Sequence, residues 1–272
     1  MRAAVCQMNA GGEDVEANVT TAVGLLEEAA AGGADLAALP ELWPFYGSHG
    51  RLRELAEPVP GPRTERLASV ARARSMWVLG GSVPERDDGK IFNTSCLFDR
   101  TGELVARYRK IHLFDVDIPG QPPLRESAVF ADGSELVSHE TDQARVGLSI
   151  CYDLRFPELY RGLMALGAEV LLVPSAFTRV TGEAHWEVLL RARAIEDQCF
   201  VVAPAQWGPW GMPEDGRRTH GHSMIVDPWG RVLVEAPGDG DGAWFADLDM
   251  AELRRVRASL PALQHRRLGL IC

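Results

Sequence analysis

The stretch ValGlyLeuSerIleCysTyrAspLeuArgPhePro spans residues 146–157 and decides the fold class. The apolar run over residues 144–150 predicts a buried strand that ends at Cys151. Pro157 opens a predicted helix over residues 157–166, because proline suits the first helical turn. Another apolar run, at residues 169–173, predicts the next strand. This strand–helix–strand order is typical of α/β proteins, in which helices cover a sheet.

Strand and helix patterns alternate along the rest of the chain, and hairpins recur in each half. About a dozen strands are more than one open sheet usually holds. We therefore expect an α/β protein with two packed mixed sheets between outer helices, in four layers. No linker or repeat interrupts the pattern, which predicts a single domain over residues 1–272. Further strands are predicted over residues 3–8, 35–39, 76–80, 91–98, 103–108, 199–205, 223–226, 231–235 and 243–248, and helices over 13–31, 65–74 (with Thr64 as N-cap), 183–197 and 250–258.

The composition of the chain excludes several classes of protein. Its 38 acidic and 28 basic residues give a net charge of -10, which argues against a general nucleic-acid binder. No apolar run approaches the roughly 18 residues of a membrane span, and the N-terminus lacks the pattern of a signal peptide. The five cysteines are widely spaced and form no CxxC motif. These features predict a cytoplasmic protein without a disulfide framework or a cysteine-rich zinc site.

Cys151 lies at the elbow between the predicted strand and helix. This position would present its side chain at the sheet edge, where backbone N–H groups and the helix dipole favour a thiolate. The alternative is a small apolar core residue, as free cysteine often is. We favour that alternative for Cys6, Cys96 and Cys199, which lie within predicted strands or at the start of one.

Two charged residues also lie at ends of predicted strands. Glu41 follows an apolar run and a proline, so its pKa could be raised enough for it to act as a base; the alternative is a solvated loop carboxylate. Lys110 is one of only two lysines beside 26 arginines. A buried lysine is a compact charge that arginine does not replace. Glu126 is the weakest candidate alone, because most such glutamates are solvated.

Three segments, taken together, carry a family pattern. LeuProGlu at 39–41, TyrArgLysIleHisLeuPheAsp at 108–115 and CysTyrAspLeuArgPhePro at 151–157 resemble the signature regions of the nitrilase superfamily of carbon–nitrogen hydrolases. The resemblance runs from residue 6 to residue 267. It implies a four-layer αββα sandwich that pairs into a homodimer or a higher oligomer, and it implies no metal or organic cofactor.

The resemblance also assigns roles to the matching residues. Cys151 would attack the amide carbonyl, and Glu41 would take the thiol proton and return it to the leaving amine. Lys110 would stabilise the oxyanion together with the backbone N–H of Tyr152. Glu126 would hold the lysine and orient substrate or water. The chemistry is coherent, because an amide is a poor electrophile that needs a strong nucleophile and a stabilised oxyanion.

The second half of the chain narrows the substrate. Residues 175–199 and 221–230 resemble the Nit branch, whose enzymes cleave amides of α-keto acids. AlaGlnTrpGly at 205–208 favours the members that cleave deaminated glutathione over the ω-amidases that act on 2-oxoglutaramate. The alternatives are an ω-amidase, an N-carbamoyl amino acid amidohydrolase, a catalytically inactive binding module on the same fold, and a thiol-based redox or acyl-transfer protein.

A keto-acid substrate needs a cation and polar groups that reach its carboxylate. Arg155 is the candidate for a bidentate clamp; the alternative is an ion pair with Asp153 or Glu158. Phe177 and Thr181, on a predicted loop, would line the pocket and contact the keto acid.

A Pro/Gly-rich loop and a pair of histidines are further features of the second half of the chain. The Pro/Gly-rich loop over residues 208–218 could line the pocket mouth. His220 and His222 raise the question of a metal, but zinc wants three or four convergent ligands and no carboxylate or cysteine accompanies the pair at suitable spacing. No metal site is therefore predicted.

Overall fold

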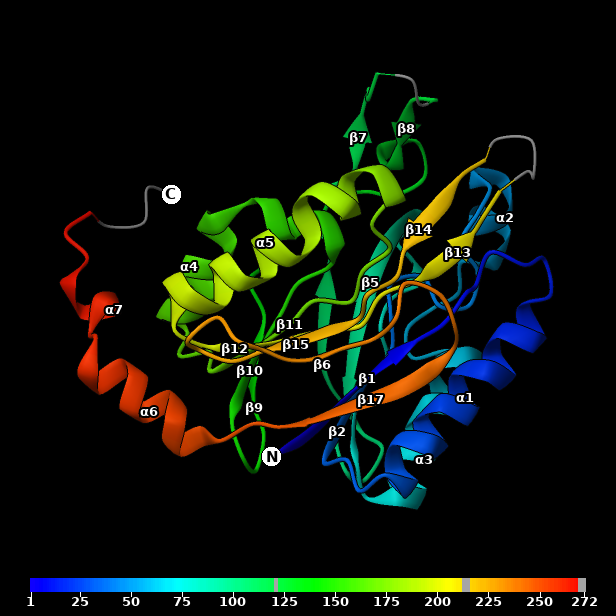
Figure 1. Cartoon of the computed structure of the whole chain (residues 1–272). Helices are drawn as coiled ribbons and strands as arrows, with labels where there is room; N and C mark the ends of the chain where they lie inside the picture. The colour runs from blue at the N-terminus through cyan, green and yellow to red at the C-terminus, as the bar shows by residue number, and fades with distance from the viewer. Residues whose placement is uncertain (120–121, 212–215, 269–272) are drawn as a thin grey trace.

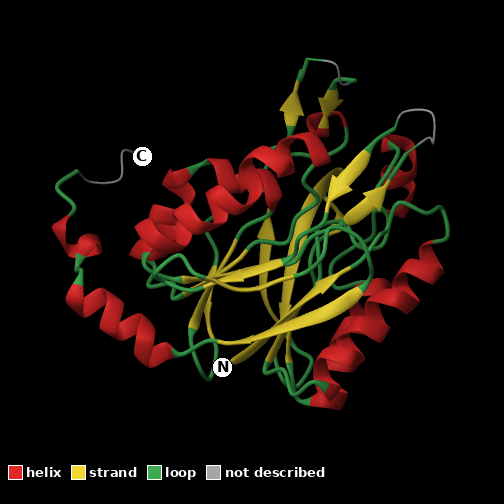
Figure 2. Ribbon diagram, viewed as in Figure 1, coloured by secondary structure: helices red, strands yellow, loops and turns green. Residues whose placement is uncertain are grey.

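The computed structural model describes residues 1–119, 122–211 and 216–268. Two β-sheets lie against each other and helices cover their outer faces, as Figures 1 and 2 show. The predicted α/β class and its four-layer arrangement are confirmed. A single domain over the whole chain stays a prediction.

The larger sheet carries the N-terminal half of the protein. Within the described residues it has seven strands in the order β17-β1-β2-β3-β5-β4, with β6 also paired to β5. The pairs β1–β2 and β2–β3 are parallel and the others are antiparallel, so the sheet is mixed. Its strands are β1 (Arg2–Gln7), β2 (Leu36–Ala38), β3 (Trp77–Leu79), β4 (Val83–Asp87), β5 (Lys90–Phe98), β6 (Leu104–Arg109) and β17 (Gly242–Asp247).

The second sheet carries the nucleophile candidate. In the part of the chain that the structure describes, it has six strands in the order β16-β15-β12-β11-β10-β9. Its centre, β10–β11–β12, is parallel, because helices connect these strands. Its strands are β9 (Ser138–Glu140), β10 (Arg145–Leu148), β11 (Val170–Leu172), β12 (Phe200–Ala203), β15 (Met224–Val226) and β16 (Val232–Glu235).

The helices and the small hairpins complete the fold. α1 and α3 cover the larger sheet and α4 and α5 cover the smaller one (Figure 1). Two hairpins, β7–β8 and β13–β14, stand outside both sheets. Their bounds and those of the helices are β7 (Asp115–Val116), β8 (Leu124–Arg125), β13 (Trp207–Pro209), β14 (Arg218–His220), α1 (Val15–Ala31), α2 (His49–Leu55), α3 (Pro62–Arg74), α4 (Pro157–Ala165), α5 (Arg179–Asp197), α6 (Met250–Ser259), α7 (Ala262–His265), and the 3-10 turns η1 (Glu126–Ala128) and η2 (Cys151–Arg155).

The core follows the two-residue period of the strands. In β1, Ala3 and Val5 belong to the cluster between the two sheets, whereas Ala4 and Cys6 face the helices on the outer side. All four side chains are fully buried. The central strands are thus covered on both faces, which explains why they form continuous apolar runs in the sequence.

Two helix starts differ from the prediction. Thr64 is not the N-cap of α3: Gly61 is, and the Thr64 hydroxyl accepts a hydrogen bond from the Gly61 N–H at 2.8 Å. α5 begins at Arg179 rather than at residue 183, because Thr178 is its N-cap and accepts from the Thr181 N–H. The elements that the sequence pattern did not reveal are short: α2, α7, β4, β7, β8, β9, β13 and β14.

Candidate active site

A cavity of about 450 Å³ lies at the end of both sheets, next to Cys151. Glu41 follows β2, Lys110 follows β6 and Cys151 follows β10, so the ends of strands from the two sheets meet here. Glu126 is the first residue of η1. All four side chains line the same cavity, as expected for the edge of a sheet where strands end.

The elbow holds Cys151 in a strained conformation. Its φ of 49° is in the left-handed region, which is unusual for a residue other than glycine. The backbone N–H of Cys151 donates to Pro174 O at 3.0 Å, which ties the elbow to the segment after β11. The backbone N–H of Ala176 and the Glu41 side chain both lie close enough to the Cys151 sulfur to shift the pKa of its thiol. The turn thus points the thiol at the candidate base.

The charged groups of the site form one hydrogen-bonded cluster. Lys110 Nζ donates to Glu41 Oε1 at 2.8 Å and to Glu126 Oε2 at 2.7 Å. The Lys110 side chain is only 1% exposed, and that of Glu41 only 4%. Burial without partners would make these charges very unfavourable, so each carboxylate depends on the ammonium between them.

Asn93 is a site residue that the sequence analysis missed. It lies in the middle of β5, fully buried, and its Nδ2 donates to Glu41 Oε1 and to Glu126 Oε1, both at 2.9 Å. Glu126 Oε2 also accepts from the backbone N–H of Phe114 at 2.7 Å. Asn93 and Lys110 therefore fix the two carboxylates relative to each other. Two other polar residues, Thr94 and Ser95, follow it in the same strand, so the local sequence does not single out Asn93.

The environment of Cys151 favours the neutral thiol at rest. Burial raises the pKa of Cys151 well above its ordinary value, and the nearby Glu41 carboxylate raises it further, against the opposing effects of Lys110 and the Ala176 N–H. The expectation that the elbow favours a thiolate was therefore wrong. Desolvation and a neighbouring carboxylate outweigh the backbone donors.

The pKa values of Glu41 and Lys110 are raised as well, with a different consequence for each group. Burial raises the pKa of Glu41, with a further increase from the Glu126 charge, while Lys110 lowers it in part. Burial alone would lower the pKa of Lys110, but the charges of Glu126 and Glu41 outweigh this effect and raise it well above the ordinary value. Glu41 is thus a strengthened base, and Lys110 stays an ammonium.

Asp153, two residues after the nucleophile candidate, fastens the elbow to the segment after β6. It is fully buried, and its Oδ2 accepts from Tyr108 Oη at 2.7 Å and from Ile150 N at 2.8 Å. Its Oδ1 accepts from the backbone N–H of His112 at 3.0 Å and lies 2.7 Å from His112 Nδ1. Since Lys110 lies within this segment, Asp153 fixes the distance between ammonium and sulfur.

The predicted substrate residues gather on the other side of Cys151. Tyr152, Arg155, Phe177 and Thr181 line a small adjoining cavity of about 10 Å³ with Cys151. Thr181 lies in α5 rather than on a loop, and its hydroxyl is 2.9 Å from that of Thr178.

The Arg155 guanidinium is not engaged by an acid. It lies over the rings of Tyr152 and Phe177 and 3.2 Å from His185 Nδ1. Within the described residues it forms no ion pair with a carboxylate, so the alternative pairing with Asp153 or Glu158 is not found.

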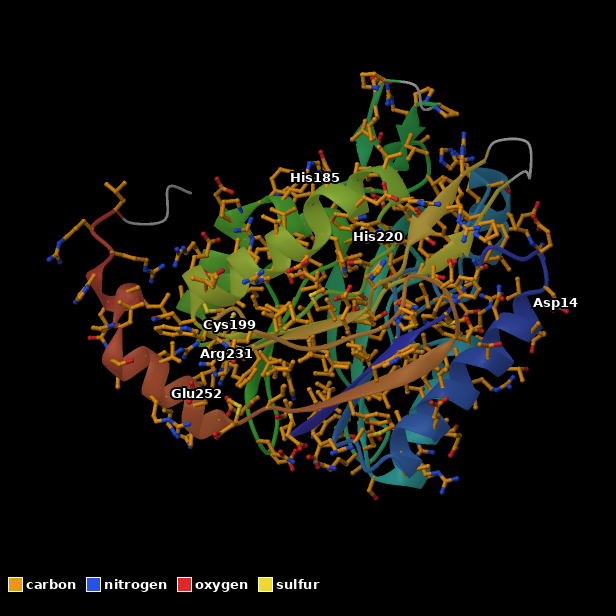
Figure 3. The ribbon with its side chains drawn as sticks, in the orientation of Figure 1. Asp14, His185, Cys199, His220, Arg231 and Glu252 are labelled. Atoms are coloured by element: carbon orange, nitrogen blue, oxygen red, sulfur yellow. The ribbon has the colours of Figure 1, made fainter. Side chains whose placement is uncertain are left out.

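The histidines at 220 and 222 have other partners. His220 packs over Gly182 of α5, and His222 Nδ1 is 2.6 Å from Glu235 Oε1. Figure 3 shows His220 and His185 on neighbouring elements, β14 and α5. Among the residues that the structure describes, no group of three or more His, Cys, Asp or Glu side chains is arranged to hold a metal ion.

Parts of the loop over residues 208–218 do reach the cavity. Trp210, Gly211 and Arg217 line it, while residues 212–215 lie outside the described residues. Along the described ranges, no helix has the length and apolar character needed to cross a bilayer.

Comparisons with known proteins agree with this geometry. The chain is 46% identical to a deaminated glutathione amidase from Bos taurus, over 97% of this chain and 81% of that protein. It is 40% identical to an omega-amidase from Homo sapiens, over 92% and 89% of the two chains. The crystal structure of the C. elegans NitFhit protein superposes with a TM-score of 0.90 at 39% identity; the match covers 99% of this chain and 66% of that one.

The carbon-nitrogen hydrolase family model matches residues 2–258, nearly the whole sequence. The predicted relationship to the nitrilase superfamily and its Nit branch is confirmed by this match and by the relatives above. The chain belongs to the carbon–nitrogen hydrolase family.

Proposed function

We propose that this chain is a thiol-dependent amidase that hydrolyses the amide bond of deaminated glutathione, an α-keto-acid amide. The observation that carries the proposal is the meeting of Glu41, Lys110, Glu126 and Cys151 at one cavity, with Lys110 hydrogen-bonded to both carboxylates. The 46% identity to an amidase of that name supports the choice of substrate.

Acylation begins with the neutral thiol. Glu41 accepts the Cys151 proton as the sulfur attacks the amide carbon, and the carbonyl electron pair moves to the oxygen. Lys110 stabilises this oxyanion, with the N–H of Tyr152, which lies in the first turn of η2, where backbone donors lack intrahelical partners. The protonated Glu41 then donates its proton to the amide nitrogen, the C–N bond breaks, and a thioester remains.

Deacylation uses the same groups, with water as the nucleophile and the Cys151 sulfur as the leaving group. The amine leaves, and a water molecule takes its place in the cavity. Glu41 accepts a proton from this water as its oxygen attacks the thioester carbon. The C–S bond breaks, the carboxylic product departs, and Glu41 returns its proton to the Cys151 sulfur. Glu126 and Asn93 keep Glu41 and Lys110 in place through both half-reactions.

The keto-acid end of the substrate belongs on the Arg155 side of Cys151. Arg155 supplies a guanidinium without a carboxylate partner among the described residues, and Phe177 supplies an apolar wall. The small cavity there must widen to admit a carboxylate, which a rotation of the partly exposed Arg155 side chain can provide.

A paired assay tests the proposal. We expect deaminated glutathione to be cleaved with a higher kcat/KM than 2-oxoglutaramate, and Cys151→Ala to lose turnover of both while its denaturation midpoint stays unchanged. Turnover retained in Cys151→Ala would refute the mechanism. A higher kcat/KM for 2-oxoglutaramate would favour the second candidate function, that of an ω-amidase. The 40% identity to the human omega-amidase supports this second candidate.

We further propose that the protein works in a reducing compartment, the cytoplasm. Four cysteines in the described part of the chain are free and buried, namely Cys6, Cys96, Cys151 and Cys199. A nucleophilic thiol stays active only where it is not oxidised.

The proposed homodimer rests on an apolar patch along α5. Val188 is 67% exposed and Ile195, two helical turns later, is 49% exposed. Trp229, 52% exposed, belongs to the β15–β16 turn, which packs against Ile195. A second copy of the chain would cover this patch. Light scattering should give twice the chain mass for the wild type and a monomer for Ile195→Glu; a monomeric wild type would refute the dimer.

A further inference from the structure

A second cavity, of about 150 Å³, adjoins the catalytic one. The two share Leu124, Trp210 and Arg217 among their lining residues. The second cavity is bounded by the β7–β8 hairpin, the start of α5 and β14. None of the residues with a role in the proposed mechanism lines it, so its function would be separate from the bond-breaking steps.

Arginine side chains supply the charged groups that line this cavity in the described part of the chain. Arg179, Arg217 and Arg218 line it, and none of its described lining residues is acidic. This is unusual in a chain with a net charge of -10. The other lining side chains are mostly apolar, among them Val116, Ile118 and Val180. A cavity with apolar walls and guanidinium groups suits a short organic anion.

The ion pairs of Arg179 and Arg218 with carboxylates lie at exposed or partly exposed positions. Arg179 Nε is 2.7 Å from Glu183, and both side chains are more than half exposed. Arg218 is 2.8 Å from Asp239, whose side chain is 66% exposed. Solvent-exposed ion pairs contribute little stability. An incoming carboxylate can therefore share or replace these partners at small cost.

The arginines also belong to segments that adjoin the reaction centre. Ala176 lines the catalytic cavity together with Cys151, and Arg179 is three residues further along the chain, so that its backbone is at most about 11 Å from that of Ala176. Thr178 pairs with Thr219, which places Arg218 beside the same segment. In deaminated glutathione the leaving amine is a dipeptide, whose carboxylate lies at most about 7 Å from the scissile nitrogen.

We propose that this arginine-lined cavity is a leaving-group subsite, which binds the terminal carboxylate of a substrate whose leaving amine is a short peptide. This inference rests on the proposed function and extends it. The keto-acid end binds on the Arg155 side of Cys151, and the peptide end extends through the catalytic cavity to Arg179 and Arg218. An amide that releases ammonia leaves the subsite empty, which makes the subsite a determinant of specificity.

The test combines enzyme variants with matched substrates. The substrates are deaminated glutathione, its analogue with a carboxamide in place of the glycine carboxylate, and 2-oxoglutaramate. The variants are Arg179→Gln, Arg218→Gln and their double variant. Arg254→Gln, which changes an exposed arginine of α6 away from both cavities, is the control. Each kcat/KM is measured at the same low salt concentration, because the contact is electrostatic.

We expect the wild type and the control to prefer the free carboxylate over the carboxamide by about tenfold or more, the effect of one charge-assisted contact. The double variant should reduce this preference to under about twofold and leave 2-oxoglutaramate within about twofold of wild type. A double variant that keeps the preference, or a wild type that cleaves both peptide substrates equally, overturns the subsite but not the amidase. A wild type that cleaves none of the three overturns the proposed function and this inference with it.

Discussion

Replacing Lys110 by glutamine should damage stability and catalysis through separate physical effects. Lys110 Nζ is the cation between Glu41 and Glu126, and its side chain is 1% exposed. Without the ammonium, the two carboxylates lie close together, and Asn93 is the hydrogen-bond donor that they still share. We expect Lys110→Gln to fold less stably at neutral pH and to lose most of its activity.

The size of the stability loss follows from the geometry. Because an oxygen of each carboxylate lies 2.9 Å from Asn93 Nδ2, those two oxygens are no more than about 6 Å apart. Two like charges at that distance repel by about 3 kcal/mol at an effective dielectric constant near 20. The loss of one oxyanion donor should lower kcat by about 10²- to 10³-fold.

A second substitution separates the two effects. Lys110→Gln/Glu126→Gln removes one of the repelling charges, so it should recover most of the lost stability while activity stays low. Lys90→Gln changes the other lysine, which is exposed, and is the matched control. Urea denaturation gives the free energy of unfolding of each protein, and turnover of deaminated glutathione gives its activity.

The pH dependence supplies a further check. A carboxyl whose pKa is raised in the folded state destabilises the protein when ionised, and this cost disappears as pH falls below the ordinary carboxyl value. The defect of Lys110→Gln should therefore be largest near pH 7 and fade toward pH 4. Stability equal to that of Lys90→Gln at pH 7, or a double variant weaker than the single one, would refute the charge argument.

Three other variants or conditions test parts of the site. Because burial raises the pKa of Glu41 above the ordinary 4.5, kcat/KM should fall as pH decreases through a value above 4.5; an acid limb at or below 4.5 would contradict this. Asp153→Asn should lower kcat about tenfold and barely change KM, since an amide N–H would face the Tyr108 and His112 donors; unchanged kcat would exclude this positioning role. Arg155→Gln should raise KM for deaminated glutathione about tenfold at constant kcat, and an unchanged KM would remove Arg155 from substrate binding.

Strand ends were the part of the fold that the sequence predicted best. Apolar runs that stop at a turn locate buried strands, and Glu41 and Cys151 each follow such a run, whereas Lys110 follows the partly buried strand β6. Their placement at one cavity depends on the order of strands in two sheets, which no local pattern contains. The shared family pattern supplied that information.

The contributions of Asn93 and Asp153 could not be predicted from local pattern. Asn93 is followed by Thr94 and Ser95 in β5, and its role depends on hydrogen bonds to Glu41 and Glu126, which are distant in sequence. Asp153 belongs to the family signature segment at residues 151–157, but its partner His112 is 41 residues away. Buried hydrogen bonds of this kind belong to the tertiary structure.

The helix starts show how a local rule can select the wrong residue. Thr64 has the side chain of a good N-cap, but Pro62 fits the first helical turn and moves the cap to Gly61. Thr64 then takes the N3 position of a reciprocal hydrogen-bonded turn. At α5, residues 180–182 are Val, Thr and Gly, which have low helix propensity, and they concealed the first turn of a helix that Thr178 caps.

The neutral thiol and the buried ammonium together determine the net charge of the site before and after proton transfer. With Cys151 neutral, Glu41 and Glu126 ionised and Lys110 protonated, the cluster carries one net negative charge. Transfer of the Cys151 proton to Glu41 moves that charge but does not add to it. No new charge is buried when the nucleophile forms, so desolvation, which raises the pKa of both groups, largely cancels in the transfer. A thiolate at rest would add a second negative charge beside Glu41, and only an additional cation could then stabilise it. In the proposed mechanism, the site therefore activates its sulfur only when a carbonyl carbon is present to receive the electron pair.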